Sequence, residues 1–224
     1  MYLPAAFAST DPAHALRLMR EHPLATLTSM GDDGFPFATP LPLHVQALSP
    51  QDGGMPFTLL GHLAKANPHC KLLDAQPQAL VCFQGPHAYM SPSVYPDARR
   101  VPTWSYLTVH CQVRVQWIDG VADKDRLLKA LIGDHEPAYA AQWRAQDAQW
   151  AHAMLQGVRA MQLHVVGWQC KLKLNQHRPE SHAAMHSAYA QGTPHEQALA
   201  QWMQDLGMVP QALPAEAPRP VTAA

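Results

Sequence analysis

The sequence predicts a mainly β fold with peripheral helices, in the form of a small antiparallel barrel of about six strands. Short strand-like runs recur between Leu24 and Leu174, and most are bounded by Gly, Pro, Asn or Asp. Helical patterns come between some of these runs, but without the regular β-α alternation of a parallel sheet. The sequence contains no G-x-G-x-x-G or G-x-x-x-x-G-K-[ST] motif, which argues against the Rossmann and P-loop classes.

Composition and charge narrow the possible partners. The chain has 224 residues, 47% of them hydrophobic, and its 16 Lys and Arg against 17 Asp and Glu leave a formal charge of -1. No broad cationic surface is implied, so nonspecific nucleic-acid binding is not the first expectation. No apolar run approaches the ~18 residues of a membrane span. The start, Met1–Pro4, lacks the features of a signal peptide. We therefore expect a cytoplasmic protein with no membrane partner.

Turn and helix signals order the elements along the chain. Thr10–Pro12 is a helix start, and Pro23 ends that helix. The remaining expected elements are strands at Leu24–Met30, Phe35–Val45, Phe57–Leu60, Ala79–Phe83, Leu107–Ile118, Met161–Val166 and Trp168–Leu174, a hairpin turn at Gly31–Gly34, a turn into a short helix at Gly61–Asp74, a long loop at Gln84–Arg100, helices within Asp123–Gly157, and two final helices, the second beginning with the capping box of Thr193 and Glu196. We expect one domain over residues 1–208 and a disordered Pro/Ala-rich tail over 209–224.

The strand at Leu107–Ile118 shows the clearest alternation. Val109, Cys111, Val113, Val115 and Trp117 fall on one face, and polar side chains fall on the other. This is the pattern of a half-buried antiparallel strand.

Gly61–Pro68 is the first candidate binding segment. A glycine turn opening a short helix offers free amide groups, Lys65 adds a positive charge, and His62 and Asn67 can donate hydrogen bonds. This combination suits a phosphate monoester. The alternative is an ordinary strand-to-helix turn with a solvated lysine.

Phe37–Leu43 is the second candidate. Its prolines donate no ladder hydrogen bond, so the strand is expected to be an edge, to be bulged, or to turn toward a ligand. The remaining backbone groups could bind a planar heterocycle with an amide-like edge. The alternative is an edge strand that proline protects against aggregation.

Two further segments carry aromatic and basic side chains. Trp104 and Tyr106 point to the same strand face and could line a ring-binding cleft, or else plug one end of the barrel. Lys171–Pro179 places a lysine pair and Arg178 at a strand end, which could clamp a phosphate or carboxylate, or else form a charged rim.

Cysteines and histidines give weaker signals. No C-x-x-C spacing occurs, and Cys82, Cys111 and Cys170 lie in apolar runs, so we interpret them as buried reduced thiols. His182 and His186 could share a metal on one helix face, but an exposed polar face is the favoured explanation. No nucleophile is paired with a base, so a hydrolase has little support.

Taken in order, six segments resemble the PaiB family, known as FMN-binding negative transcriptional regulators. They are Met1–Pro4 with Phe7, His22–Leu27, Gly61–Pro68, Phe83–Pro96, Val101–His110 and Lys173–Pro179. The resemblance covers about residues 1–206 and implies an FMN-binding split barrel, similar to those of flavin reductases and pyridoxamine-phosphate oxidases. It also implies a homodimer with flavin near the subunit interface. The sequence departs from the family pattern at Val94, Ser105, Asn175 and His177.

The resemblance also implies roles for particular residues. It makes His62, Lys65 and Asn67 the phosphate contacts, Thr39, Pro40 and Leu41 contacts of the ring edge, and Trp104, Tyr106, Gln176 and Arg178 pocket-lining residues, some from the partner subunit. The function it implies is a flavin-dependent oxidoreductase. The alternative is a ligand-sensing transcriptional repressor without turnover, although the chain shows no helix-turn-helix signature or basic run for DNA. A metal or haem binder that uses the histidines is a third hypothesis.

Overall fold

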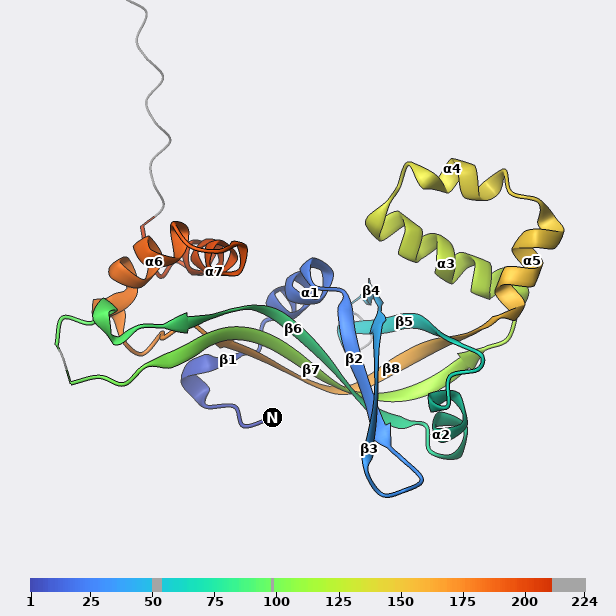
Figure 1. Cartoon of the computed structure of the whole chain (residues 1–224), viewed down its shortest axis with the longest axis horizontal. Coiled ribbons are helices and arrows are strands. Elements are labelled where there is room, and N and C mark those ends of the chain that lie inside the picture. Colours follow the sequence, from blue (N-terminus) through green and yellow to red (C-terminus); the bar gives the residue numbers. More distant parts are fainter. Residues whose placement is uncertain (50–53, 98, 211–224) are drawn as a thin grey trace, which may run out of the picture. The chain divides into compact units, whose positions relative to one another are not determined.

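The computed structural model describes residues 1–49, 54–97 and 99–210 (Figure 1). Where the sequence predicts one domain, the chain groups into two compact units. The first unit comprises Met1–Gly85 and Tyr106–Leu172, and the second comprises Pro86–Ser105 and the described part of Lys173–Ala224. The predicted tail lies outside the described residues except for Val209 and Pro210, and Val209 is buried.

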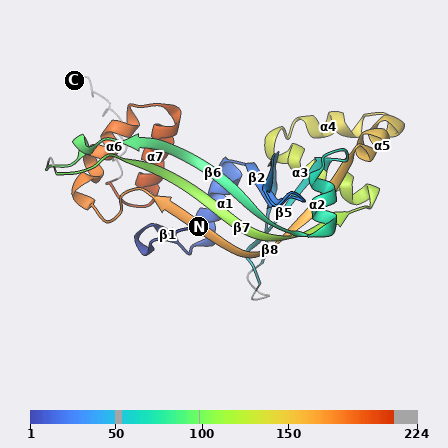
Figure 2. The same cartoon turned by 60° about the horizontal axis from the view of Figure 1, so that its bottom comes forward.

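The strands form one eight-stranded sheet in the order β3-β2-β6-β7-β8-β5-β4, with β1 paired to β8. In Figure 2, β6, β7 and β8 run side by side as this order requires. The mainly antiparallel class with peripheral helices is confirmed, but the sheet has eight strands where about six were expected. Their bounds are β1 (Ala8–Ser9), β2 (Leu24–Met30), β3 (Pro36–Pro42), β4 (His44–Ala47), β5 (Phe57–Ala64), β6 (Gln78–Met90), β7 (Thr103–Ile118) and β8 (Val158–Lys173).

A single residue joins the two ends of the sheet order. The run Phe35–Val45, expected as one strand, breaks at Leu43, whose backbone N–H still donates to the Pro23 carbonyl over 3.0 Å, in line with the β2–β3 register. The two resulting strands, β3 and β4, take opposite ends of the order. Because only Leu43 separates them, the two ends of the sheet order come together at this residue, although β3 and β4 are not neighbours in the order of the described strands, as in a split barrel.

Strand β3 is an edge strand, as its prolines predict. It pairs with β2 alone, in antiparallel register from Leu24 opposite Pro42 to Met30 opposite Pro36. The connecting turn is closed by Gly31 N–H donating to the Phe35 carbonyl over 2.8 Å, and Gly34 takes a positive φ of 82°. The hairpin prediction is therefore confirmed.

Helix starts follow the predicted capping signals. Asp11 Oδ1 accepts the Ala13 N–H over 2.8 Å, and Thr193 and Glu196 form the predicted capping box. The helices are α1 (Pro12–Glu21), α2 (His69–Ala75), α3 (Val121–His135), α4 (Tyr139–Arg144), α5 (Ala148–Gln156), α6 (His182–Ala190) and α7 (Pro194–Asp205). Within the described ranges, none is long and apolar enough to cross a membrane.

Strand β6 extends further than the sequence suggests. Gln84–Arg100 was expected to be a loop, but β6 continues to Met90. The dipeptide at Gly85 and Pro86 resembles a turn signal. In the structure, Gly85 instead gives room to α1, because a Cβ there would lie 2.5 Å from Leu18 Cδ1.

The core of the first unit confirms the alternation on β7. Val109, Cys111, Val113 and Val115 are buried. Trp117, the fifth residue predicted for that face, is only half-buried. The fully buried part of the face therefore ends at Val115 and not at Trp117.

Candidate functional site

The turn between β5 and α2 begins later than the sequence suggests. Gly61 and His62 belong to strand β5, which ends at Ala64, so they are not part of a helix-opening turn. Gly61 lacks a side chain for a packing reason, because a Cβ there would lie 2.4 Å from Leu43 Cδ2. The turn itself is held by Lys65 N–H donating to the Gly157 carbonyl and Asn67 N–H donating to the Ala64 carbonyl, each over 2.9 Å.

A cationic cavity of about 470 Å³ opens at this turn. Its lining contains three positive side chains, one carboxylate and one amide. Arg159 reaches it from β8, because β5 and β8 pair with Leu63 opposite Arg159. The lining residues are Lys65, Ala66, Asn67, Pro68, Cys70, Lys71, Asp74 and Arg159.

Arg159 is fixed in this cavity by two neighbours. Its terminal nitrogens donate to both carboxylate oxygens of Asp74, over 2.7 and 2.9 Å. Its guanidinium carbon lies 3.7 Å from the centre of the Trp117 ring. The hydrogen bonds from Arg159 hold the pKa of Asp74 below its usual value. Both groups therefore stay charged, and the planar guanidinium is pre-organised.

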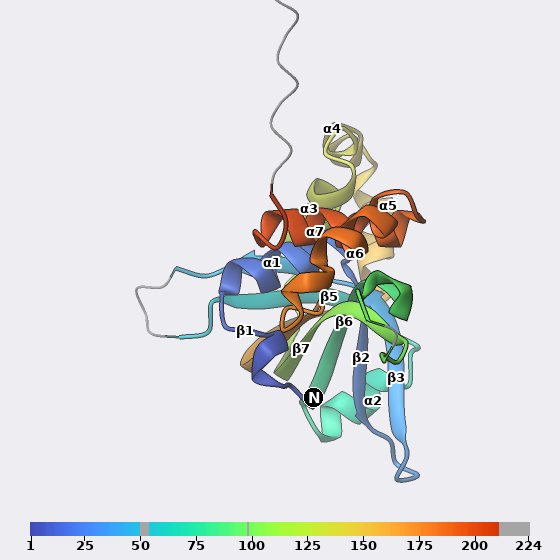
Figure 3. The ribbon, with the colours of Figure 1, turned by 90° about the vertical axis from the view of Figure 1, so that its left-hand side faces the viewer.

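A second polar cluster ties the same turn to the β2–β3 hairpin, which α2 flanks in Figure 3. The His69 ring lies between two hydroxyls, with Nδ1 2.8 Å from Thr39 Oγ1 and Nε2 3.0 Å from Ser29 Oγ. Asn67 Oδ1 accepts the His69 backbone N–H over 2.9 Å, and Asn67 Nδ2 donates to Thr39 Oγ1 over 3.5 Å. The structure therefore brings Thr39 and Asn67 together, while Asn67 shares the cavity with Lys65.

The other first-unit candidates differ in what they can offer. The Leu41 side chain is 3% exposed and packs toward Gly61, so only its backbone is available to a ligand. Pro40 is exposed on the edge strand. His62 Nδ1 is buried without a hydrogen-bond partner among the described residues, and burial lowers the pKa of His62. Such an atom is one of the few unsatisfied polar groups in the described chain.

The predicted aromatic pair is divided between the two units. Tyr106 belongs to the first unit, where the buried Lys171 ammonium lies 5.1 Å from the centre of its ring. Trp104 belongs to the second unit, where it stacks on His87 at 5.9 Å and donates its Nε1–H to His87 Nδ1 over 3.2 Å. Its side chain is 48% exposed.

Gln176 and Arg178 also belong to the second unit, where they shape a turn. Gln176 Oε1 accepts the Leu174 N–H over 3.1 Å, and Arg178 N–H donates to the Asn175 carbonyl over 2.9 Å. Asn175 has a positive φ of 65°, which asparagine tolerates well.

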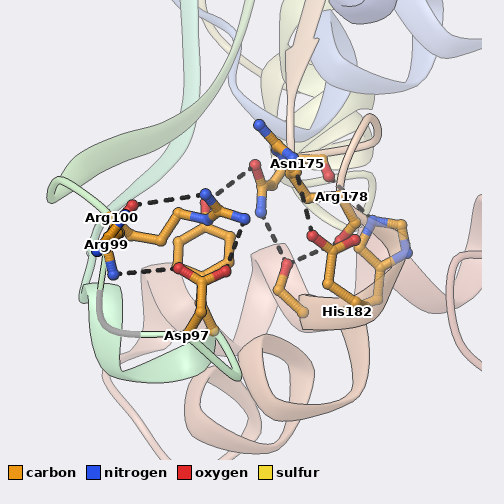
Figure 4. Close-up of polar contacts among 9 residues, drawn as sticks. Asp97, Arg99, Arg100, Asn175, Arg178 and His182 are labelled. Atoms are coloured by element: carbon orange, nitrogen blue, oxygen red, sulfur yellow. Dashed lines mark hydrogen bonds and ion pairs between the residues drawn. The ribbon is translucent and has the colours of Figure 1, made fainter.

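Figure 4 shows how Asn175 is connected within the second unit. Its amide donates to Ser181 Oγ over 2.8 Å, and its side-chain oxygen accepts the Tyr95 hydroxyl over 3.3 Å. Arg100 lies over the Tyr95 ring at 5.3 Å and pairs with Asp97 at 2.8 Å. Asn175 therefore anchors a polar network, and its contacts are with the protein itself.

Sequence reasoning missed four groups, three at the cavity and one in its neighbouring cluster. Lys71 and Asp74 lie on α2, beyond the C-terminal end of the candidate segment at Pro68. Arg159 is far away in sequence. Only the β5–β8 register brings Arg159 to this turn. His69 directly follows Asn67 and Pro68, so its position next to a candidate contact was the one available signal.

Cysteines and possible metal ligands complete the survey. Cys70, Cys111 and Cys170 are buried and Cys82 is half-buried, all as free thiols. In the part of the chain that the structure describes, no three His, Cys, Asp or Glu side chains gather as a metal site would require.

Comparison with known proteins gives the family. Residues 1–166 match the family described as "Putative FMN-binding domain". The chain is 29% identical over 183 residues to "Protease synthase and sporulation protein PAI 2" of Bacillus subtilis, covering 81% of this chain and 84% of that protein.

Two solved structures share the fold. The FAD and heme binding protein from Mycobacterium smegmatis has a TM-score of 0.57 at 21% identity, covering 74% of this chain and 73% of that one. The flavocytochrome Anf3 from Azotobacter vinelandii also has a TM-score of 0.57, at 18% identity, covering 74% of this chain and 69% of that one.

The fold is that of a flavin-binding split barrel. The chain belongs to the FMN-binding domain family of PaiB type, and its cofactor is FMN. The donor set at the β5–α2 turn fits the phosphate of that cofactor. A phosphate monoester carries about −1.5 to −2 charges near pH 7, and the cavity offers three cations and an amide against one carboxylate.

Proposed function

We propose that this chain is an FMN-dependent oxidoreductase that holds the cofactor phosphate in the cavity at the β5–α2 turn. The observation that carries the proposal is the joint lining of that cavity by Lys65, Asn67, Lys71 and Arg159. Lysine and arginine bind phosphate through charge-assisted hydrogen bonds, and the amide adds a neutral donor. Arg159 is already held by Asp74 and Trp117, so it needs little ordering on binding.

The residues of the hairpin supply the second part of the proposed site. Thr39 is linked to the cavity through Asn67, and the neighbouring backbone of Pro40 and Leu41 lies on the edge strand. FMN, when bound, supplies the electron-transfer chemistry, while the protein supplies binding, orientation and electrostatics. In this proposal, Lys65 and its neighbours hold the phosphate, and the hairpin orients the ring edge.

A titration of the apoprotein with FMN tests the phosphate site. Lys65→Ala should weaken FMN binding about 10- to 100-fold, because a hydrogen bond to a charged group contributes about 1.5–3 kcal/mol. Lys129→Ala is the matched control, because Lys129 pairs with Asp125 on α3 and does not line the cavity. Equal affinities for the two variants would place the phosphate elsewhere.

Turnover is tested separately from binding. FMN-loaded protein should oxidise NADH or NADPH faster than the same concentration of free FMN. If neither nucleotide is oxidised faster, the oxidoreductase proposal fails.

We further propose that the protein is a homodimer that pairs through the outer face of the sheet. Met30 on β2 and Val166 on β8 are each 56% exposed. They line a shared hollow of about 580 Å³ together with Leu80. Exposed apolar surface of this kind marks interaction sites. Sedimentation should show a dimer that Val166→Asp dissociates, and a monomeric wild-type protein would contradict the proposal.

Regulation is the second candidate function, which the resemblance to the PaiB family implies, and the Bacillus subtilis relative is named for protease synthase and sporulation. A ligand-sensing repressor would use bound FMN without turnover. The near-zero formal charge gives weak electrostatic support for DNA binding. A gel-shift assay at low salt with the promoter of its own gene tests this candidate, and the absence of a shift would count against it.

A further inference from the structure

His69 occupies an unusual position for a histidine. It is 0% exposed, and both ring nitrogens meet hydroxyl groups on neighbouring strands, Ser29 on β2 and Thr39 on β3. The Phe37 ring closes one side, with ring centres 5.1 Å apart. The imidazole therefore joins α2 to both strands of the hairpin that we propose to orient FMN.

The surroundings of the His69 ring favour its neutral form, because the ring is buried and both of its nitrogens meet uncharged hydroxyl groups. Burial lowers the pKa of His69 below its ordinary value of 6.5. A neutral imidazole has one N–H donor and one bare acceptor nitrogen. The hydroxyls of Ser29 and Thr39 therefore have opposite roles toward the ring. One accepts the ring N–H, and the other donates its hydrogen to the bare ring nitrogen.

Ser29 decides which nitrogen is bare. Its side chain is 8% exposed, and among the described residues its hydroxyl meets only His69 Nε2. If Nε2 carried the proton, the Ser29 hydroxyl hydrogen would be buried without an acceptor, which is costly. If Nε2 is bare, Ser29 donates to it. The proton then lies on Nδ1.

Thr39 receives two hydrogen bonds as a result. Asn67 Oδ1 accepts the His69 backbone N–H, so the amide nitrogen of Asn67 must be the group that faces Thr39 Oγ1. With Nδ1–H of His69 donating as well, both lone pairs of Oγ1 are engaged. The hydroxyl hydrogen of half-buried Thr39 is left to point to an acceptor outside the cluster.

We propose that His69 is a positioning residue that, through its Nδ1–H tautomer, makes Thr39 an obligate hydrogen-bond donor to bound FMN. Flavin ring edges carry carbonyl oxygens and bare nitrogens that can accept such a bond. This inference rests on the proposed location of FMN beside Thr39 and Asn67. It assigns His69 no contact with the cofactor.

The tautomer can be measured without any cofactor. Long-range nitrogen–proton NMR of the apoprotein should show His69 protonated at Nδ1. Ser29→Ala removes the donor to Nε2 and should increase the population of the Nε2–H form. A wild-type ring protonated at Nε2 would overturn the inference.

Two substitutions of His69 separate positioning from packing. The amide of asparagine reaches the place of Nδ1, and that of glutamine reaches the place of Nε2. His69→Asn should keep FMN affinity within about threefold of wild type, whereas His69→Gln should weaken it about tenfold, or about 1.4 kcal/mol. Both variants lose the buried ring, so both should lower the melting temperature by similar amounts. Equal affinities, or the reverse order, would refute the positioning role.

A pair of Thr39 variants keeps the test decisive if the His69 variants do not fold. Thr39→Ser retains the hydroxyl and should bind FMN nearly as wild type does. Thr39→Val loses the hydroxyl and should bind about tenfold more weakly. Equal binding by the two would overturn the donor role.

The Lys65→Ala variant separates failure of this inference from failure of the proposed site. If Lys65→Ala also leaves FMN affinity unchanged, the proposed site is wrong. If only the effects of the Thr39 and His69 variants are missing, this inference alone fails.

Discussion

Arg159 and Trp117 form a stacked pair in which the guanidinium carbon lies 3.7 Å from the centre of the indole ring. The same guanidinium donates two hydrogen bonds to the Asp74 carboxylate. The aromatic ring and the carboxylate therefore fix the position of one of the cationic groups that line the proposed phosphate cavity.

Trp117→Ala should therefore weaken FMN binding at only a small cost in the stability of the fold. Trp117 is half-buried, and an exposed cation–π contact contributes only about 0.5–1 kcal/mol. We expect FMN affinity to fall about threefold to tenfold and the free energy of unfolding to fall by about 1 kcal/mol. Leu163→Ala, in the core, should cost about 2–5 kcal/mol and serves as the control. A loss of stability in Trp117→Ala as large as that of the control would contradict this.

Gly85→Ala should destabilise the first unit by about 1–3 kcal/mol through overpacking. The added Cβ would lie 2.5 Å from Leu18 Cδ1 and 3.1 Å from the Leu107 carbonyl oxygen, and that backbone atom cannot move aside cheaply. Gly133→Ala, where no atom lies within 4 Å, should instead stabilise α3, by about 0.5–1 kcal/mol. Urea denaturation of both variants measures the contrast, and effects of the same sign would refute it.

Stability should decline on the acid side of neutrality. Burial lowers the pKa of His62, His69 and His110 below the ordinary value of 6.5. The unfolded chain then binds protons that the folded chain does not, so the stabilisation is present above about pH 6.5 and is lost as pH falls toward the lowered values. Denaturation curves between pH 5 and 8 on His69→Asn should show a shallower decline than wild type, and an unchanged slope would exclude His69 as a contributor.

Thiol chemistry should distinguish the cysteines. Burial raises the pKa of both Cys111 and Cys170 to about 12. Since the thiolate is the reactive form, a disulfide reagent at pH 8 should leave both untouched in the native protein. Half-buried Cys82 should react first. Peptide mapping identifies the modified residue, and early labelling of Cys111 would contradict the burial argument.

Local patterns predicted most of the first unit's elements correctly. The helix at Pro12, the strand at Leu24–Met30 and the edge position of β3 depend on capping, alternation and proline chemistry, which are local. Gly61 was misread as part of a turn, and Gly85 was placed in a loop that is in fact strand β6. Each of them makes room for a leucine distant in sequence, and only the folded chain shows which.

Only some of the residues that line the cavity could be named from the sequence, for the same reason. Lys65 and Asn67 lie in one short segment, so a local reading could find them. Arg159 joins them through strand register, and His69 gains its role from two hydroxyls on other strands. No periodicity in the sequence specifies those distances. The cofactor-binding roles given to all the candidate residues stay predictions, namely those of Thr39, Pro40, Leu41, His62, Lys65, Asn67, Trp104, Tyr106, Gln176 and Arg178.

The one-residue joint at Leu43 restricts where this chain can change length. An inserted or deleted residue in β3 has no loop to absorb it before β4 begins. The change in length would shift the pairing register of β4 by one residue. Every side chain of β4 that faces inward would then face outward. Natural length variants of this barrel should therefore cluster at the Gly31–Gly34 turn and avoid the joint, so that an alignment gap at Leu43 would mark a protein with a different barrel closure.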